Sequence, residues 1–186
     1  MAPPQAESIA VIGAGRIGRE LARRAAVAGY RVILEDLIPT SLTFARQEIR
    51  QTLDDAVASG TLDQAGADAA FARIDCATSI EDAARQARIV METGPDETES
   101  KLEMFCLLDR ICLPNTVIVS NCHALDLSDT AAKAEIIVGM YFTGDRAEIH
   151  CSAFTSENAL AIAKQLATRM ASSYTITRDT NSAASA

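Results

Sequence analysis

Three glycines between an apolar stretch and an alanine-rich stretch constrain the fold of this chain most strongly. Gly13, Gly15 and Gly18 form the pattern G-x-G-x-x-G. The pattern follows residues 8–12, which predict a short buried strand, and precedes residues 16–28, which predict a helix. The first glycine permits a tight turn, the second lets a pyrophosphate approach the backbone, and the third lets the helix pack closely on the strand. The spacing therefore predicts a dinucleotide site.

The residues around this loop define the expected cofactor. Free amides at the helix start, at Arg16 and Ile17, would hold the phosphates with the help of the helix dipole. Asp36 follows a second predicted strand and could accept hydrogen bonds from the adenosine ribose, and its charge would repel a 2′-phosphate. Glu35 is also acidic, but neighbours on a strand point oppositely, so only one of the two should face the ribose. We therefore predict NAD in preference to NADP; a glycine-rich turn that binds no nucleotide is the alternative.

Apolar strand-like segments alternate with helical ones along the rest of the chain. This alternation predicts an α/β fold: a Rossmann-type, doubly wound, mostly parallel sheet with helices on both faces, in a single domain. We expect a flexible leader at 1–7, an NAD-binding domain at 8–179 and a flexible tail at 180–186. Strands are expected at residues 8–12, 31–34, 72–76, 88–91, 116–119, 135–140, 147–151 and 174–177. Helices are expected at residues 16–28, 40–59, 62–72, 80–86, 97–111, 125–132 and 157–170.

Composition excludes several classes of partner. The net charge of −8 argues against nucleic acid and against an anionic membrane surface, because both need a basic face. The sequence has no apolar run of the roughly 18 residues that a transmembrane helix needs. The five cysteines are odd in number and form no CxxC pair, so we expect no metal site and reduced thiols in a cytoplasmic protein.

Beyond the glycine loop, the sequence resembles the NAD-binding domain of the 3-hydroxyacyl-CoA dehydrogenases over roughly residues 9–180. The stretches that carry the resemblance are VIGAGRIGRELARRAAVAGYRVILED, SIEDAARQARIVMETGPDETESKLEMFCLLDRIC, NTVIVSN, IIVGMYF and SENALAIAKQLATRM. The resemblance implies NAD as cofactor, an acyl-CoA-like substrate and a place in fatty acid metabolism. It also implies that Glu92, Lys101 and Asn121 lie beside the cofactor, with Asn121 next to the nicotinamide ribose.

The sequence departs from the family pattern at the residues that the resemblance would assign to catalysis. Tyr141 stands where the family carries the histidine that acts as general base, and His123 stands where it carries a substrate-contacting serine. Glu148 is the nearest candidate for the glutamate that orients the histidine. The chain ends at TRDTNSAASA, where the family would enter a helical second domain that closes the substrate cleft and forms the dimer.

Two functions are compatible with this pattern. One is an NAD-holding protein whose dehydrogenase chemistry has been lost, a pseudoenzyme. The other is an active NAD-dependent oxidoreductase on a 3-hydroxyacyl or related hydroxy substrate, with His123 as a relocated base and Tyr141 as its partner. A separate helical subunit or a homo-oligomer could complete the cleft. His150, which precedes Cys151 on or near a predicted strand, is expected to be an ordinary surface or hydrogen-bonded residue.

Overall fold

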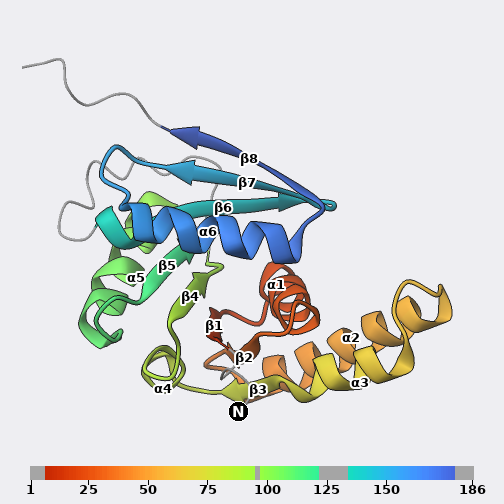
Figure 1. Cartoon of the computed structure of the whole chain (residues 1–186). Coiled ribbons are helices and arrows are strands. Elements are labelled where there is room, and N and C mark those ends of the chain that lie inside the picture. The colour runs from red at the N-terminus through yellow and green to blue at the C-terminus, as the bar shows by residue number, and fades with distance from the viewer. Residues whose placement is uncertain (1–6, 95–96, 122–133, 179–186) are drawn as a thin grey trace, which may run out of the picture. The chain divides into compact units, whose positions relative to one another are not determined.

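The computed structural model describes residues 7–94, 97–121 and 134–178 (Figure 1). The chain divides into two compact units, residues 1–93 and 94–186. Among the described residues, no helix is long and apolar enough to cross a membrane.

The first unit is built from repeated strand–helix–strand crossovers. Its four strands run parallel in the order β3-β2-β1-β4. Its elements are β1 (Ser8–Ile12), α1 (Arg16–Val27), β2 (Arg31–Glu35), α2 (Pro39–Ala58), α3 (Gln64–Ala72), β3 (Ile74–Ala77), α4 (Ile80–Ala84) and β4 (Ile89–Glu92).

The strand order of this unit reverses at β1. The chain winds from β1 through β2 to β3, then returns through α4 to place β4 on the other side of β1. Because such crossovers are right-handed, this reversal puts α4 on the opposite face of the sheet from α1. The carboxyl ends of strands at such a reversal form the crevice in which doubly wound sheets bind ligands. The glycine loop follows β1 at this point.

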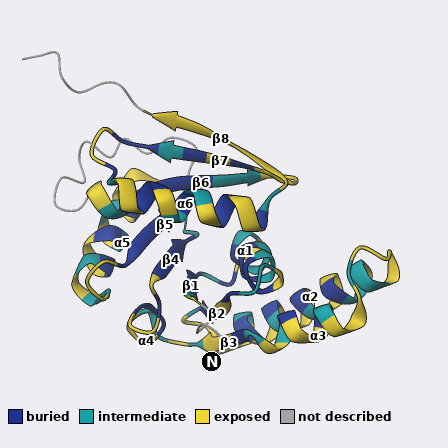
Figure 2. Ribbon diagram, in the orientation of Figure 1, coloured by how far each residue is buried: buried dark blue, intermediate teal, exposed yellow. Residues whose placement is uncertain are grey.

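The core of the first unit explains its sequence pattern. Strand β1 is buried along almost its whole length, as a central parallel strand covered on both faces must be (Figure 2). Helix α1 buries Leu21, Ala22, Ala25 and Ala26. The alanines on this stripe let the helix lie close to the sheet, so that its first turn is held against the glycine loop.

The second unit has a mixed sheet. Its strands lie in the order β5-β6-β7-β8; β5 and β6 are parallel, β6 and β7 antiparallel, and β7 and β8 parallel. Its elements are α5 (Thr98–Ile111), β5 (Val117–Ser120), the 3₁₀ turn η2 (Ala134–Ile136), β6 (Ile137–Thr143), β7 (Arg146–Cys151), α6 (Glu157–Met170) and β8 (Ser173–Arg178).

Along the β6–β7 hairpin, the two faces of the second unit's sheet differ in polarity. Buried Ala147, Ile149 and Cys151 alternate along β7 with more exposed polar residues. Helix α6 lies along β6, β7 and β8 and covers the apolar face (Figure 1). Strand β8 is exposed along its whole length (Figure 2). The polar residues of β6 and β7 therefore share the face opposite α6.

The predicted α/β, Rossmann-type fold with a mostly parallel sheet is confirmed. Most boundaries differ from the prediction by one or two residues. The largest difference is in the strand expected at 135–140: it begins at Ile137, because residues 134–136 form a 3₁₀ turn, and it continues to Thr143. Helix α2 begins at Pro39, whose fixed φ suits the first helical position. The helix expected at 125–132 lies outside the described residues.

Candidate cofactor site

Gly13 and Gly18 hold the glycine loop closed against helix α1. Gly13 has a φ of +99°, and its N–H donates to the Glu35 carbonyl at 2.9 Å. A Cβ on Gly18 would lie 1.8 Å from the Gly13 carbonyl oxygen, so no larger residue fits there without moving the loop. Thr93 after β4 donates its hydroxyl to the Ile12 carbonyl at 2.7 Å and fixes the start of the turn.

Gly15 has the opposite surroundings. It is the N-cap of α1 and is exposed, and a Cβ built on it would meet nothing within 4 Å. No side chain caps α1 there, and its first turn has no acidic residue. Arg16 is exposed and Ile17 half-buried at the first two helical positions. An anion can therefore approach these amides, so the loop fits the pyrophosphate of a dinucleotide.

Asp36 connects the glycine loop to the turn that follows β2. Its carboxylate Oδ2 accepts from the Ala14 N–H at 3.0 Å, and Oδ1 accepts from the Ile38 N–H at 2.9 Å. A carboxylate oxygen has a second lone pair, so each oxygen can accept a further hydrogen bond. Asp36 is half-buried. Its contact with the adenosine ribose stays a prediction, and its position beside the loop is compatible with it.

Glu35 differs sharply from its neighbour. Its side chain is 2 % exposed, and its Oε1 atom has no hydrogen-bond partner among the described residues. Burial raises the pKa of the Glu35 carboxyl to about 7; the Asp36 charge adds to the rise, and a hydrogen bond from the Gly13 amide opposes it. Of the two acids at the end of β2, Asp36 is therefore the one accessible to a ligand.

Glu92 ends β4 beside the loop. Its Cα partner on β1 is Ile12, the residue immediately before Gly13, and its side chain is 1 % exposed. It therefore lies at the carboxyl end of the first unit's sheet, where the sequence places a cofactor-side residue. The role itself stays a prediction.

Lys101 and Asn121 belong to the second unit. Lys101 lies on α5, is 5 % exposed and donates from Nζ to the Ser120 Oγ at 3.3 Å. Asn121 follows directly after β5 and is half-buried. The two predicted cofactor residues are thus linked through the strand end at Ser120. Their contacts with a cofactor stay predictions.

The proposed catalytic residues of β6 and β7 come together in the hairpin. Tyr141 and Glu148 are direct cross-strand partners, so the register pairs the two residues that the resemblance singled out. His123 lies outside the described residues. The hairpin adds a residue that sequence reasoning set aside: His150 Nε2 lies 3.7 Å from Glu148 Oε2. The alternation in RAEIHC, which puts His150 on the same face as Glu148, was the available signal.

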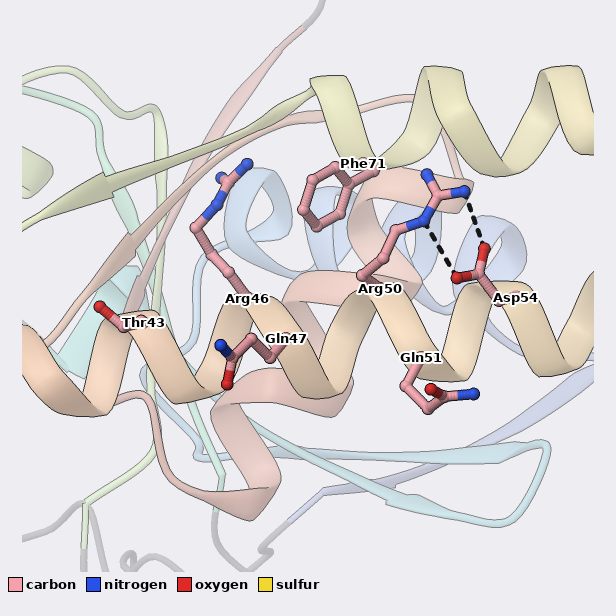
Figure 3. A pocket seen from close by; sticks show the side chains of 7 residues that line it. All are labelled: Thr43, Arg46, Gln47, Arg50, Gln51, Asp54 and Phe71. Atoms are coloured by element: carbon pink, nitrogen blue, oxygen red, sulfur yellow. Dashed lines mark hydrogen bonds and ion pairs between the residues drawn. The ribbon is translucent and has the colours of Figure 1, made fainter.

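A hollow away from the glycine loop lies along α2 and α3, with a volume of about 550 Å³. Arg46 and Arg50 stand on either side of the Phe71 ring, 4.5 and 5.6 Å from its centroid (Figure 3). Arg50 is paired with Asp54 and Asp68 at 2.7 Å each. These arginines hold the two helices together, and we assign the hollow no ligand.

Comparison with known proteins links the chain to one protein family. The family model for the 3-hydroxyacyl-CoA dehydrogenase NAD-binding domain matches residues 8–180. A probable 3-hydroxybutyryl-CoA dehydrogenase of Bacillus subtilis is 31% identical over 73% of this chain and 48% of its own length. A 3-hydroxyadipyl-CoA dehydrogenase of Escherichia coli is 30% identical over 73% of this chain and 29% of its own length.

Solved structures agree on the fold. The 3-hydroxybutyryl-CoA dehydrogenase of Escherichia coli superposes with a TM-score of 0.86 at 24% identity, over 94% of this chain and 39% of that one. The (S)-3-hydroxybutyryl-CoA dehydrogenase of Ralstonia eutropha gives 0.86 at 22% identity, over 94% and 64%. The chain thus spans about half or less of the length of the two curated relatives above. It belongs to the 3-hydroxyacyl-CoA dehydrogenase family, whose NAD-binding domain it matches, and NAD is the cofactor of that domain.

Proposed function

We propose that the chain holds NAD through the glycine loop and Asp36, and that this binding is its primary function. The observation that carries the proposal is a contrast between two glycines of the loop. A Cβ on Gly18 would clash with the Gly13 carbonyl oxygen, whereas a Cβ on Gly15 would meet nothing within 4 Å. A tight glycine turn without a ligand would need the first feature but not the second.

Each part of the loop has a defined task in this proposal. The amides at the start of α1 bind the pyrophosphate, and the dipole of a 12-residue helix favours its negative charge. Asp36 accepts hydrogen bonds from the adenosine ribose hydroxyls, and its charge disfavours the additional phosphate of NADP. Bound NAD supplies the nicotinamide that accepts a hydride.

Titration calorimetry with NAD and NADP tests this proposal. We expect NAD to bind and NADP to bind at least tenfold more weakly. Gly15→Asp should abolish NAD binding, because the new carboxylate would occupy the open space where the pyrophosphate lies. Asp36→Asn should weaken binding about 10–100-fold, the loss of a hydrogen bond to a charged group.

The matched control is Asp75→Asn, which removes the same charge from an exposed residue of β3 in the same unit. Its NAD affinity should equal that of the wild type. A folded Gly15→Asp chain with unchanged NAD affinity would contradict the proposed site.

A second candidate function is turnover of a 3-hydroxyacyl-CoA-like thioester. The observation that favours it is the grouping of Tyr141, Glu148 and His150 on one face of the β6–β7 hairpin. Formation of NADH with a panel of 3-hydroxyacyl-CoA substrates of different chain lengths tests it. NAD binding without turnover on this panel would identify the chain as a pseudoenzyme, a site that keeps its cofactor and has lost its chemistry.

We also propose that the chain is a cytoplasmic protein connected to fatty acid metabolism. Cys76 and Cys106 are exposed thiols, which suits a reducing cytoplasm. An acyl-CoA substrate would connect the chain to fatty acid metabolism. A second copy of the chain or a separate helical subunit would cover the substrate. Light scattering in solution tests the second copy directly: a mass of 19.8 kDa at all concentrations would exclude it.

A further inference from the structure

A row of residues crosses three strands of the second unit on the face opposite α6. The register pairs Ser120 of β5 with Gly139 of β6, and Gly139 with His150 of β7. Cross-strand partners share a face, and glycine has no side chain. Gly139 therefore places no side chain between the Ser120 hydroxyl and the His150 imidazole.

His150 is oriented by its strand neighbour. Its Nε2 atom is buried, accepts or donates no hydrogen bond among the described residues, and lies 3.7 Å from the Glu148 carboxylate. The side chain as a whole is 22% exposed, so its exposed part does not include Nε2. A carboxylate on this side favours the tautomer with the proton on Nε2 and leaves Nδ1 as the basic nitrogen.

Several described groups lie on the same face as His150. Tyr141 of β6 lies opposite Glu148, Arg146 stands at the start of β7, and Lys101 of α5 reaches the same face through Ser120. On the far side, β8 contributes uncharged residues to this face: Ser173, Thr175 and Thr177. One carboxylate and one imidazole thus form an acid–base pair with no second acid among the cross-strand neighbours on this face.

We infer that His150, positioned by Glu148, is the proton acceptor for an alcohol substrate bound on this face. The inference assigns a catalytic residue to the second candidate function, turnover, and it rests on that function. Oxidised NAD, when bound, would supply the acceptor for the hydride and its two electrons that leave the substrate carbon. The hydroxyl proton passes to His150, and the carbon–oxygen single bond becomes a carbonyl. The sequence alone would assign this proton to His123 or Tyr141.

The first test is a pH profile of NADH formation by the full chain with 3-hydroxybutyryl-CoA and longer 3-hydroxyacyl-CoA probes. His150→Gln should lower kcat at least 100-fold and remove one limb of the profile. Glu148→Gln should shift that limb and lower kcat less. Arg169→Gln, at an exposed position of α6 on the other face of the sheet, is the matched control and should leave both unchanged.

The NAD dissociation constant of each variant separates this inference from NAD binding. His150→Gln should bind NAD within about twofold of the wild type. An unchanged rate and pH profile in His150→Gln would overturn the inference. A wild-type chain that binds NAD without turnover would also overturn it and leave the NAD-binding proposal standing, whereas absent NAD binding would overturn both.

A second test observes the imidazole ring of His150 directly and needs no substrate. The chain has only two histidines, so a His123→Gln background leaves a single imidazole for ¹⁵N resonance spectroscopy. We expect the neutral ring of His150 to carry its proton on Nε2, and the preference to weaken in Glu148→Gln. A neutral ring protonated on Nδ1 would contradict the assigned proton acceptor.

Discussion

At the scale of single residues, two adjacent acids at the end of β2 have opposite roles. Asp36 is accessible and its two oxygens are held by backbone amides on either side of it. Glu35 is buried, and burial raises the pKa of its carboxyl to about 7. Alternation along a strand predicts that only one of them faces a ligand, but it cannot show that the other is enclosed.

Glu35 should make the stability of the chain depend on pH. Its pKa is about 7 in the folded chain against an ordinary value of 4.5, so the folded state binds an extra proton between these values. The contribution of protonated Glu35 is therefore complete below pH 4.5 and is lost as the pH rises through 7. We expect the wild type to lose about 3 kcal/mol of unfolding free energy, relative to Glu35→Gln, between pH 4.5 and 8.

Urea unfolding at several pH values measures this difference. Glu48→Gln, at an exposed position on α2, is the control and should follow the wild type. Parallel curves for the wild type and Glu35→Gln would show that Glu35 is ionised at neutral pH in the folded chain.

The two loop glycines give a second residue-scale prediction. Gly18→Ala would place a Cβ 1.8 Å from the Gly13 carbonyl oxygen, and relieving such overpacking costs about 1–3 kcal/mol of unfolding free energy. Gly15→Ala meets nothing within 4 Å and should change that free energy by less than about 0.5 kcal/mol. Denaturant unfolding of both variants measures the contrast; equal losses would mean that the loop does not have this geometry.

At the scale of elements, the β6–β7 hairpin decides which side chains meet. The closing pair is Thr143 and Arg146, joined by Gly144 and Asp145. Gly144 has a φ of +56°, as the first central residue of a type II′ turn requires. A shift of one residue in this register would move Tyr141 away from Glu148 and turn His150 to the α6 face. The turn is therefore what positions the polar face.

Gly144→Val should destabilise this hairpin. A β-branched residue at a positive φ costs about 1–2 kcal/mol, so we expect a loss of that size in unfolding free energy. Gly144→Asn should lose less, because asparagine tolerates this conformation. Urea unfolding of the two variants provides the comparison, and an equal, negligible loss in both would argue against the type II′ turn.

At the scale of the whole molecule, the sequence predicts the architecture well and the polar face poorly. Glycine spacing, alternating segments and Asp36 were sufficient for the fold and the cofactor, because they depend on local pattern. The sequence did not predict that His150 lies beside Glu148 on the polar face. That placement depends on the register of the antiparallel β6–β7 hairpin, which the local sequence pattern does not give. The 3₁₀ turn at 134–136 was missed because its apolar residues continue the pattern of β6.

Ligand binding should stabilise the whole chain selectively. NAD at 100 times its dissociation constant adds about 2.7 kcal/mol to the unfolding free energy, which corresponds to about 5–10 °C in Tm for a chain of this size. NADP at the same concentration should give a much smaller shift. Thermal unfolding followed by circular dichroism measures both, and equal shifts for NAD and NADP would contradict the discrimination assigned to Asp36.

A crystal structure of the chain with NAD tests the central claim most directly. We predict that the pyrophosphate oxygens accept hydrogen bonds from the amides of Gly15, Arg16 and Ile17. The adenosine ribose hydroxyls should lie within 3.2 Å of the Asp36 carboxylate, about the usual limit for such bonds. NAD bound away from this loop, or with its adenosine ribose out of reach of Asp36, would contradict the account.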